Sequence, residues 1–113
     1  MNVYDHFKQP HNVGSIKKSL KATVKNSLCG DELTLYIKMN GKVKDAKFTA
    51  NACMLCQASA SLLTDYVKGL NAEKLKKIDD RKIFKLLGFT PTPSRTGCAL
   101  LSLKALNRII DKK

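Results

Sequence analysis

The sequence of 113 residues lacks the features of a membrane or secreted protein. No apolar run approaches the roughly 20 residues that a membrane-spanning helix needs. The first residues also lack the charged-then-apolar order of a secretory signal peptide, and there is no internal repeat or low-complexity segment. We therefore expect a single domain over residues 1–113 in the cytoplasm, where thiols stay reduced and are free for metal or redox chemistry.

Acidic residues are scarce in this chain. Nine Asp and Glu stand against 21 Lys and Arg, so the formal net charge is +12. Such a charge permits binding to nucleic acid or to an acidic protein surface. The lysines are spread along the chain, however, without the interleaved aromatic residues of a single-strand-binding surface. We therefore expect solvated basic faces that favour an acidic protein partner, and neither a membrane nor a nucleic acid as the main target.

Alternating apolar residues predict two strands between residues 33 and 50, and an extended run at 22–27 could supply a third. Asn40-Gly41 is the preferred two-residue turn of a tight hairpin. With that turn the facing residues are fixed: Met39 with Lys42, Leu35 with Ala46, Leu33 with Phe48, Asp31 with Ala50, and Cys29 with Ala52.

The rest of the chain has the apolar spacing of helices. We predict helices over roughly 55–67, 72–78 and 81–87 and from residue 99 onward, with Gly69 and Gly88 as stops. The expected fold is α+β, with a small antiparallel sheet of about three strands in the N-terminal half packed against several helices.

Three of the four cysteines lie where these elements would bring them together. Cys29 precedes the hairpin, and Cys53 and Cys98 each lie just before a predicted helix, where the helix dipole favours a thiolate. Asp31 lies two residues beyond Cys29, on the same strand face. Thiolates with one carboxylate can bind zinc, iron or an iron–sulfur centre, in a site able to exchange what it holds. The alternative is that these cysteines are small buried apolar residues.

The remaining candidate ligands are less clearly placed. Cys56 forms Cys-x-x-Cys with Cys53, but the strands here precede all major helices, unlike in a thioredoxin-like βαβ chain. Cys56 therefore either packs in the core or serves as a spare ligand or resolving thiol. We expect His6 and His11 to be surface or capping residues, since nothing in the pattern brings them to the sheet end, and Asp65 to be an ordinary surface residue.

A series of motifs runs in order along nearly the whole chain. They are His6-Phe7-Lys8-Gln9-Pro10, Asn12-Val13-Gly14, Cys29-Gly30-Asp31, Asp45-Ala46-Lys47-Phe48, Cys53 followed by Ala58-Ser59-Ala60-Ser61, Val67-Lys68-Gly69 and Cys98-Ala99-Leu100-Leu101. Together they resemble the IscU/SufU scaffold proteins, which are related to the N-terminal domain of NifU.

This resemblance implies a SufE/NifU-like domain that acts as a scaffold and not as an enzyme. It implies that [2Fe–2S] clusters are assembled from iron and from the sulfur of a cysteine desulfurase, then passed to apo iron–sulfur proteins. By resemblance the cluster ligands are Cys29, Asp31, Cys53 and Cys98, and Cys98 also accepts persulfide sulfur. Whether two copies form a homodimer around one cluster is left open.

Two stretches depart from the family pattern. Gly97 stands where IscU proteins usually have a His before the third cysteine, so Asp31 gains importance as a ligand. The run at 91–95 replaces the Leu-Pro-Pro-Val-Lys segment recognised by an Hsp70 chaperone, which argues against that partner. SufU proteins also lack the His, but typically carry an insertion after the second cysteine for which this chain has no obvious room.

Two alternative functions remain from the sequence. In the first, Zn²⁺ occupies the same four residues and the protein is a zinc-bound persulfide acceptor for a desulfurase. In the second, which we rank far behind, the chain is a basic nucleic-acid-binding zinc module.

Overall fold

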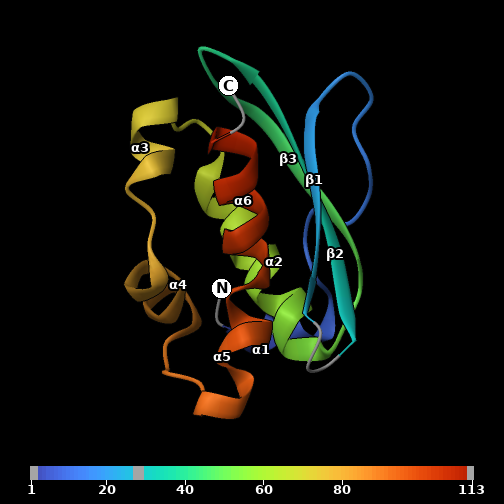
Figure 1. The fold of residues 1–113 in the computed structure, drawn as a ribbon, viewed down its shortest axis with the longest axis vertical. Coiled ribbons are helices and arrows are strands. Elements are labelled where there is room, and N and C mark those ends of the chain that lie inside the picture. Colours follow the sequence, from blue (N-terminus) through green and yellow to red (C-terminus); the bar gives the residue numbers. More distant parts are fainter. Residues whose placement is uncertain (1–2, 27–29, 112–113) are drawn as a thin grey trace.

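The computed structural model describes residues 3–26 and 30–111, so the predicted ligand Cys29 lies outside the described residues. The elements, shown in Figure 1, follow one another in this order: α1 (Val3–Lys8), β1 (Leu20–Asn26), β2 (Asp31–Asn40), β3 (Lys42–Asn51), α2 (Met54–Val67), α3 (Ala72–Lys76), α4 (Asp80–Leu87), a 3₁₀ turn (Pro93–Arg95), α5 (Thr96–Ala99) and α6 (Leu101–Asp111).

The three strands form one antiparallel sheet in the order β1-β2-β3, with helices on one face (Figure 1). Alternate strand residues are buried, as the period of two requires for a sheet with one covered face. Helices α2 and α6 pack on that face, and α4 packs against α2. The predicted α+β fold is therefore confirmed.

The register of the β2–β3 hairpin differs from the predicted one. Leu35 pairs with Phe48 instead of Ala46, because the pairing at the turn differs from the predicted one by one residue and the register shifts by one more between Lys38 and Met39. A bulge of this kind adds one unpaired residue to a strand. The total displacement is two residues, which keeps every side chain on its predicted face. The error in the predicted register therefore does not change which residues form the apolar face of the hairpin.

The N-terminal segment covers one edge of the sheet. Gly14 N donates to Phe48 O at 2.8 Å, and Phe48 N donates to Asn12 O at 2.9 Å. Further along the same strand, Val43 exchanges backbone hydrogen bonds of 2.8 and 2.9 Å with Leu70 O and Gly69 N. Strand β3 is thus paired on both sides, although it is the last strand of the sheet.

The helices largely follow the predicted ranges. Gly88 ends α4 in the left-handed conformation with φ of 85°, as a C-terminal glycine does. Two features were not predicted: helix α1, and the start of the last helical region at Thr96, ahead of Cys98. Cys98 therefore lies inside the short helix α5, three residues before α6 begins. Within the described ranges, no helix has both the length and the apolar character to cross a membrane.

Two buried serines on the helices have different surroundings. Ser59 on α2 donates its hydroxyl to Ala99 O at 2.5 Å and so fastens α5 against α2. Ser102 on α6 is equally buried, but its hydroxyl has no hydrogen-bond partner in the described structure. A buried hydroxyl contributes to stability only when it is hydrogen-bonded.

We predict that Ser59→Ala lowers the free energy of unfolding by about 1–2 kcal/mol, because Ala99 O loses its donor. Ser102→Ala is the matched control, and we expect it to leave stability within about 0.5 kcal/mol or to raise it slightly. Urea unfolding followed by circular dichroism measures both values. Equal losses in the two variants would contradict the assignment.

Candidate functional site

Three side chains from distant parts of the chain meet at one end of the sheet. Asp31 is the first residue of β2, Cys53 immediately precedes α2, and Cys98 belongs to α5. One carboxylate oxygen and the two sulfurs all lie within 4.8 Å of one another. Of the four residues that the sequence singles out as ligands, the structure thus brings three together, and Cys29 lies outside the described residues.

Cys53 is held in place by the start of helix α2. It is the N-cap residue, with extended backbone angles (φ of −67°, ψ of 166°), and Gln57 N donates to Cys53 O at 3.1 Å. Its side chain makes no capping hydrogen bond, so the sulfur is not used to terminate the helix. The start of α2 therefore positions this sulfur as a candidate metal ligand.

Cys98 has a polar neighbour that no sequence pattern predicts. Asn26 at the end of β1 donates from Nδ2 to Cys98 Sγ at 3.7 Å, across 72 positions in sequence. The adjacent Gly97 is what leaves room for this amide, since a Cβ there would lie 3.0 Å from Asn26 Nδ2. Gly97 therefore makes space for a polar group beside Cys98.

Asp31 is buried in a manner that suits a ligand. Its residue is 6% exposed, and its Oδ2 has no hydrogen-bond partner in the described part of the chain. An unsatisfied buried oxygen of this kind costs about 1–3 kcal/mol. A metal ion bound between Asp31 and the two cysteines would supply the missing partner, and carboxylate with thiolate is a donor set that both zinc and iron accept.

The site is closed on one side and open on another. Cys98 is only 1% exposed, whereas Cys53 is partly exposed. Cys53 also lines an apolar pocket of about 640 Å³, together with Phe7 of α1, the exposed Met54 and Phe89, and other residues of the stretch before α5. Access to the sulfur atoms from outside therefore leads past Cys53 and this pocket.

Cys56 does not join this group of atoms. It is fully buried in the core and is absent from the cluster formed by Asp31, Cys53 and Cys98. In α2 it follows Cys53 by three residues and packs among the apolar side chains that face the sheet. The sequence left open whether Cys56 packs in the core or serves as a spare ligand or resolving thiol. In the structure its side chain packs in the core.

The expectation that His6 is a surface or capping residue is wrong. His6 is 2% exposed, and its Nδ1 is 2.6 Å from Ser61 Oγ on α2. Asp65, whose side chain is 40% exposed, is a surface residue as expected, and its Oδ2 lies 2.7 Å from His11 Nδ1. The sequence pattern missed this arrangement because helix α1, which carries His6 to α2, has no clear apolar period.

Comparison with known proteins defines the class of this one. Residues 1–112 match the family described as the NifU-like N terminal domain. The chain therefore belongs to this family, and the resemblance inferred from the sequence motifs is confirmed.

The relatives within this class carry two kinds of name. The chain is 34% identical, over 98% of its length and 88% of the relative, to the zinc-dependent sulfurtransferase SufU of Bacillus subtilis. It is 36% identical, over 96% of its length and 71% of the relative, to the iron–sulfur cluster assembly scaffold protein IscU 1 of Archaeoglobus fulgidus. A crystal structure of a putative iron–sulfur cluster assembly scaffold protein from Fervidobacterium islandicum matches with a TM-score of 0.80 at 25% identity, covering 96% and 93% of the two chains.

We predict that Asn26→Ala slows alkylation of Cys98 by iodoacetamide at neutral pH roughly two- to tenfold, because the thiolate loses a donor. Gly97→Ala should act in the same direction, since the new methyl group pushes the amide away. Rates for Cys98 are followed by peptide mass spectrometry. Asn107→Ala on the exposed side of α6 is the control, and an unchanged rate in Asn26→Ala would remove the assigned contact.

Proposed function

We propose that this protein is a cytoplasmic scaffold that assembles [2Fe–2S] clusters from iron and desulfurase-derived sulfur and passes them to apo-proteins. The observation that carries the proposal is the meeting of Asp31, Cys53 and Cys98 within 4.8 Å, with Asp31 Oδ2 buried and unpaired in the described structure. Cys29, two residues before Asp31, is proposed as the fourth ligand. The scaffold names of the archaeal and other relatives support this function.

Sulfur would reach the site by exchange between two proteins. In this step the thiolate of Cys98 attacks the outer sulfur of a persulfide on the desulfurase cysteine. A new S–S bond forms on Cys98, the S–S bond of the desulfurase persulfide breaks, and the desulfurase cysteine leaves as a thiolate. The proton on the outer sulfur stays with it, so atoms and charge balance. Reducing that sulfur to sulfide then takes two electrons from a donor outside this chain.

The ligand set explains why such cargo would be released. Iron–sulfur clusters are usually held by four cysteine thiolates. Here the proposed set replaces one thiolate with the oxygen of Asp31, a harder and weaker partner for a sulfide-bridged cluster. A recipient protein that offers four cysteines can therefore withdraw the cluster by ligand exchange.

Burial of Cys98 sets a requirement on the partner. At 1% exposure its sulfur cannot meet a persulfide on another protein unless α5 and the preceding stretch move. That stretch, residues 89–95, also forms part of the pocket beside Cys53. Docking of the desulfurase would have to open this side of the site, and the net charge of +12 favours a partner with an acidic docking surface.

A second candidate function is that of a zinc-bound persulfide acceptor, which would make the protein a sulfurtransferase. The name of the Bacillus subtilis relative supports it, and Zn²⁺ would be held by the same four residues. One observation favours the scaffold. The match to that relative extends over 129 residues, more than the 113 of this chain, so the relative contains inserted residues, whereas the archaeal scaffold matches over 110.

Anaerobic reconstitution distinguishes the two functions. The protein is incubated with iron, cysteine and a cysteine desulfurase, and the visible absorption and metal content are then measured. Thiolate-to-iron absorption with about two irons and two sulfides per cluster supports the scaffold. Tightly held zinc that iron does not replace, together with persulfide on Cys98, would overturn it in favour of the sulfurtransferase.

We predict that Cys98→Ser abolishes transfer of sulfur from the desulfurase, because a hydroxyl does not attack a persulfide at neutral pH. Cys56→Ala is the matched control, since that cysteine is buried outside the site, and its persulfide yield should stay near that of the wild type. Mass spectrometry after incubation with radiolabelled cysteine gives the yield. A normal yield in Cys98→Ser would assign the acceptor role to another cysteine.

We predict that Asp31→Ala makes a reconstituted cluster longer-lived, because the weakest ligand and its exchange route are removed. The expected change is a decrease of roughly tenfold in the rate of cluster transfer to an apo-ferredoxin. Circular dichroism of the cluster follows the transfer, and the far-ultraviolet spectrum checks the fold. A shorter-lived cluster would show that Asp31 holds the cluster and does not release it.

A further inference from the structure

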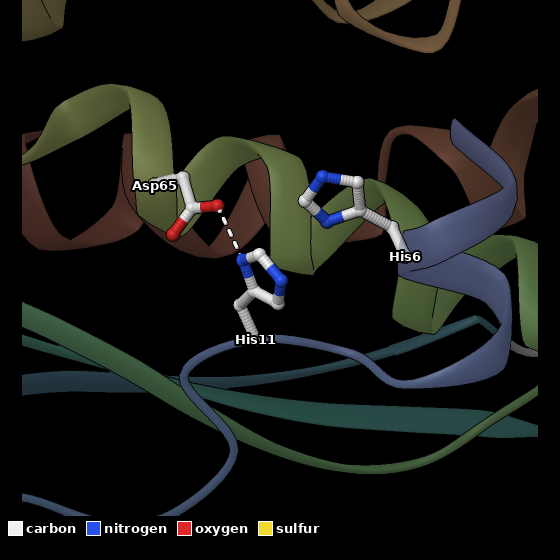
Figure 2. A group of neighbouring side chains, drawn as sticks. All are labelled: His6, His11 and Asp65. Carbon is white, nitrogen blue, oxygen red and sulfur yellow. Dashed lines mark hydrogen bonds and ion pairs between the residues drawn. The ribbon is translucent and has the colours of Figure 1, made fainter. Parts of the chain in front are cut away.

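Three side chains outside the cysteine site also meet at one place. His6 comes from α1, His11 from the segment that follows it, and Asp65 from the second half of α2. Two ring nitrogens and one carboxylate oxygen lie within 4.8 Å of one another, and Figure 2 shows the three side chains pointing toward a common space. The two imidazole rings are 4.6 Å apart between centroids.

We propose that His6, His11 and Asp65 form a second metal site that binds a divalent transition-metal ion such as Zn²⁺. Two imidazoles and one carboxylate are a donor set that such ions accept, with open positions for water. The side chains of His11 and Asp65 are 31% and 40% exposed, so an ion can enter from solvent. His6 supplies the buried side of the site.

The surrounding hydrogen bonds orient these ligands. Ser61 Oγ lies 2.6 Å from His6 Nδ1, and Asn12 Nδ2 donates to Asp65 Oδ1 at 2.8 Å and to Thr64 Oγ1 at 2.9 Å. Outer contacts of this type fix the rotamers of metal ligands and are part of most metal sites. The ligand side chains are therefore held near one another before an ion arrives.

The protonation states also suit an ion. Burial, and after it the charge of His11, lowers the pKa of His6, although Asp65 and Asp5 act in the opposite direction. Burial alone would raise the pKa of Asp65, but hydrogen bonds from Asn12 and His11 outweigh it and lower that pKa. A neutral imidazole and an ionised carboxylate are the forms that bind metals.

To bind between these ligands, an ion would have to replace the direct contact between His11 and Asp65. His11 Nδ1 and Asp65 Oδ2 are 2.7 Å apart, too close for both to ligate an ion through these two atoms without moving. Ligand atoms on a tetrahedral zinc ion are about 3.4 Å apart. The pair would therefore separate by less than 1 Å, while His6 closes in from the 4.8 Å limit.

The new site is separate from the cysteine site. Cys53 precedes α2, and Asp65 lies twelve residues further along the same helix. At a rise of 1.5 Å per residue the two positions are about 18 Å apart. The two sites can be occupied independently, and helix α1 lies between them: His6 belongs to the second site, while Phe7 lines the pocket beside Cys53.

Zinc titration of untagged protein tests the proposal. In a Cys29→Ser, Cys53→Ser, Cys98→Ser variant the first site is silenced, and calorimetry should still show one equivalent of bound Zn²⁺ with micromolar affinity. Adding His11→Ala or Asp65→Asn should weaken this binding by about 100-fold or more, because a lost ligand costs more than a lost outer contact. The binding should also weaken as the pH is lowered, because protons then compete with the ion for its ligands.

Asp45→Asn is the matched control, since the side chain of Asp45 is 40% exposed like that of Asp65 but does not belong to the group of His6, His11 and Asp65. Its zinc affinity should be unchanged. If the triple serine variant does not fold, the wild-type protein replaces it, with two equivalents expected against one in His11→Ala. A triple variant that folds but binds no zinc would overturn the proposal, as would binding insensitive to His11 and Asp65. Neither result bears on cluster assembly, which depends on the cysteines.

Discussion

The attachment of helix α2 to its neighbours is the constraint on which the rest of this structure depends. Its first turn follows Cys53, its middle holds α5 through the bond from Ser59 to Ala99, and its last turns hold the N-terminal segment through Ser61 and Asp65. One helix therefore sets the positions of two separate groups of candidate metal ligands. A rigid central element of this kind holds ligands more precisely than loops do.

The cysteine site combines burial with an incomplete set of internal bonds. Asp31 keeps a buried oxygen without a partner in the described chain, and Cys98 is covered by the helices around it. Such an arrangement costs stability, which a fold tolerates where function requires it. The apolar pocket beside Cys53 lies next to the more exposed of the two sulfurs, so the unpaired oxygen of Asp31 and the route from solvent belong to the same site.

Much of the sheet and of the cysteine site could be predicted from the sequence, but the pairing within the hairpin could not. The alternation of strand residues predicted the sheet, and the meeting of Asp31 with Cys53 and Cys98 agrees with the placement expected from it. The register of the hairpin was wrong by two residues, because the Asn-Gly dipeptide alone determines neither the pairing at the turn nor the bulge beside it. A two-residue error leaves faces unchanged, so the site did not depend on it.

Other features could not be seen in the sequence for physical reasons. The contact between Asn26 and Cys98 depends on tertiary packing across 72 positions, and no local pattern reports it. Helix α1 is only six residues long, too short for an apolar period, and so His6 had no visible route to α2. Resemblance to the family predicted a set of cluster ligands, whereas the two histidines were expected at the surface because nothing in the sequence pattern places them beside other ligands.

The covering of strand β3 by residues 12–14 has a consequence for handling the protein. These residues, with Leu70 and Gly69, occupy the backbone groups of a strand that would otherwise be an open template for pairing with another molecule. At the opposite edge of the sheet, β1 carries Lys21 and Lys25, whose charges discourage pairing of this strand with a strand of another molecule. A shortened chain that begins beyond residue 14 would uncover β3 and would tend to form fibrils or aggregates on storage.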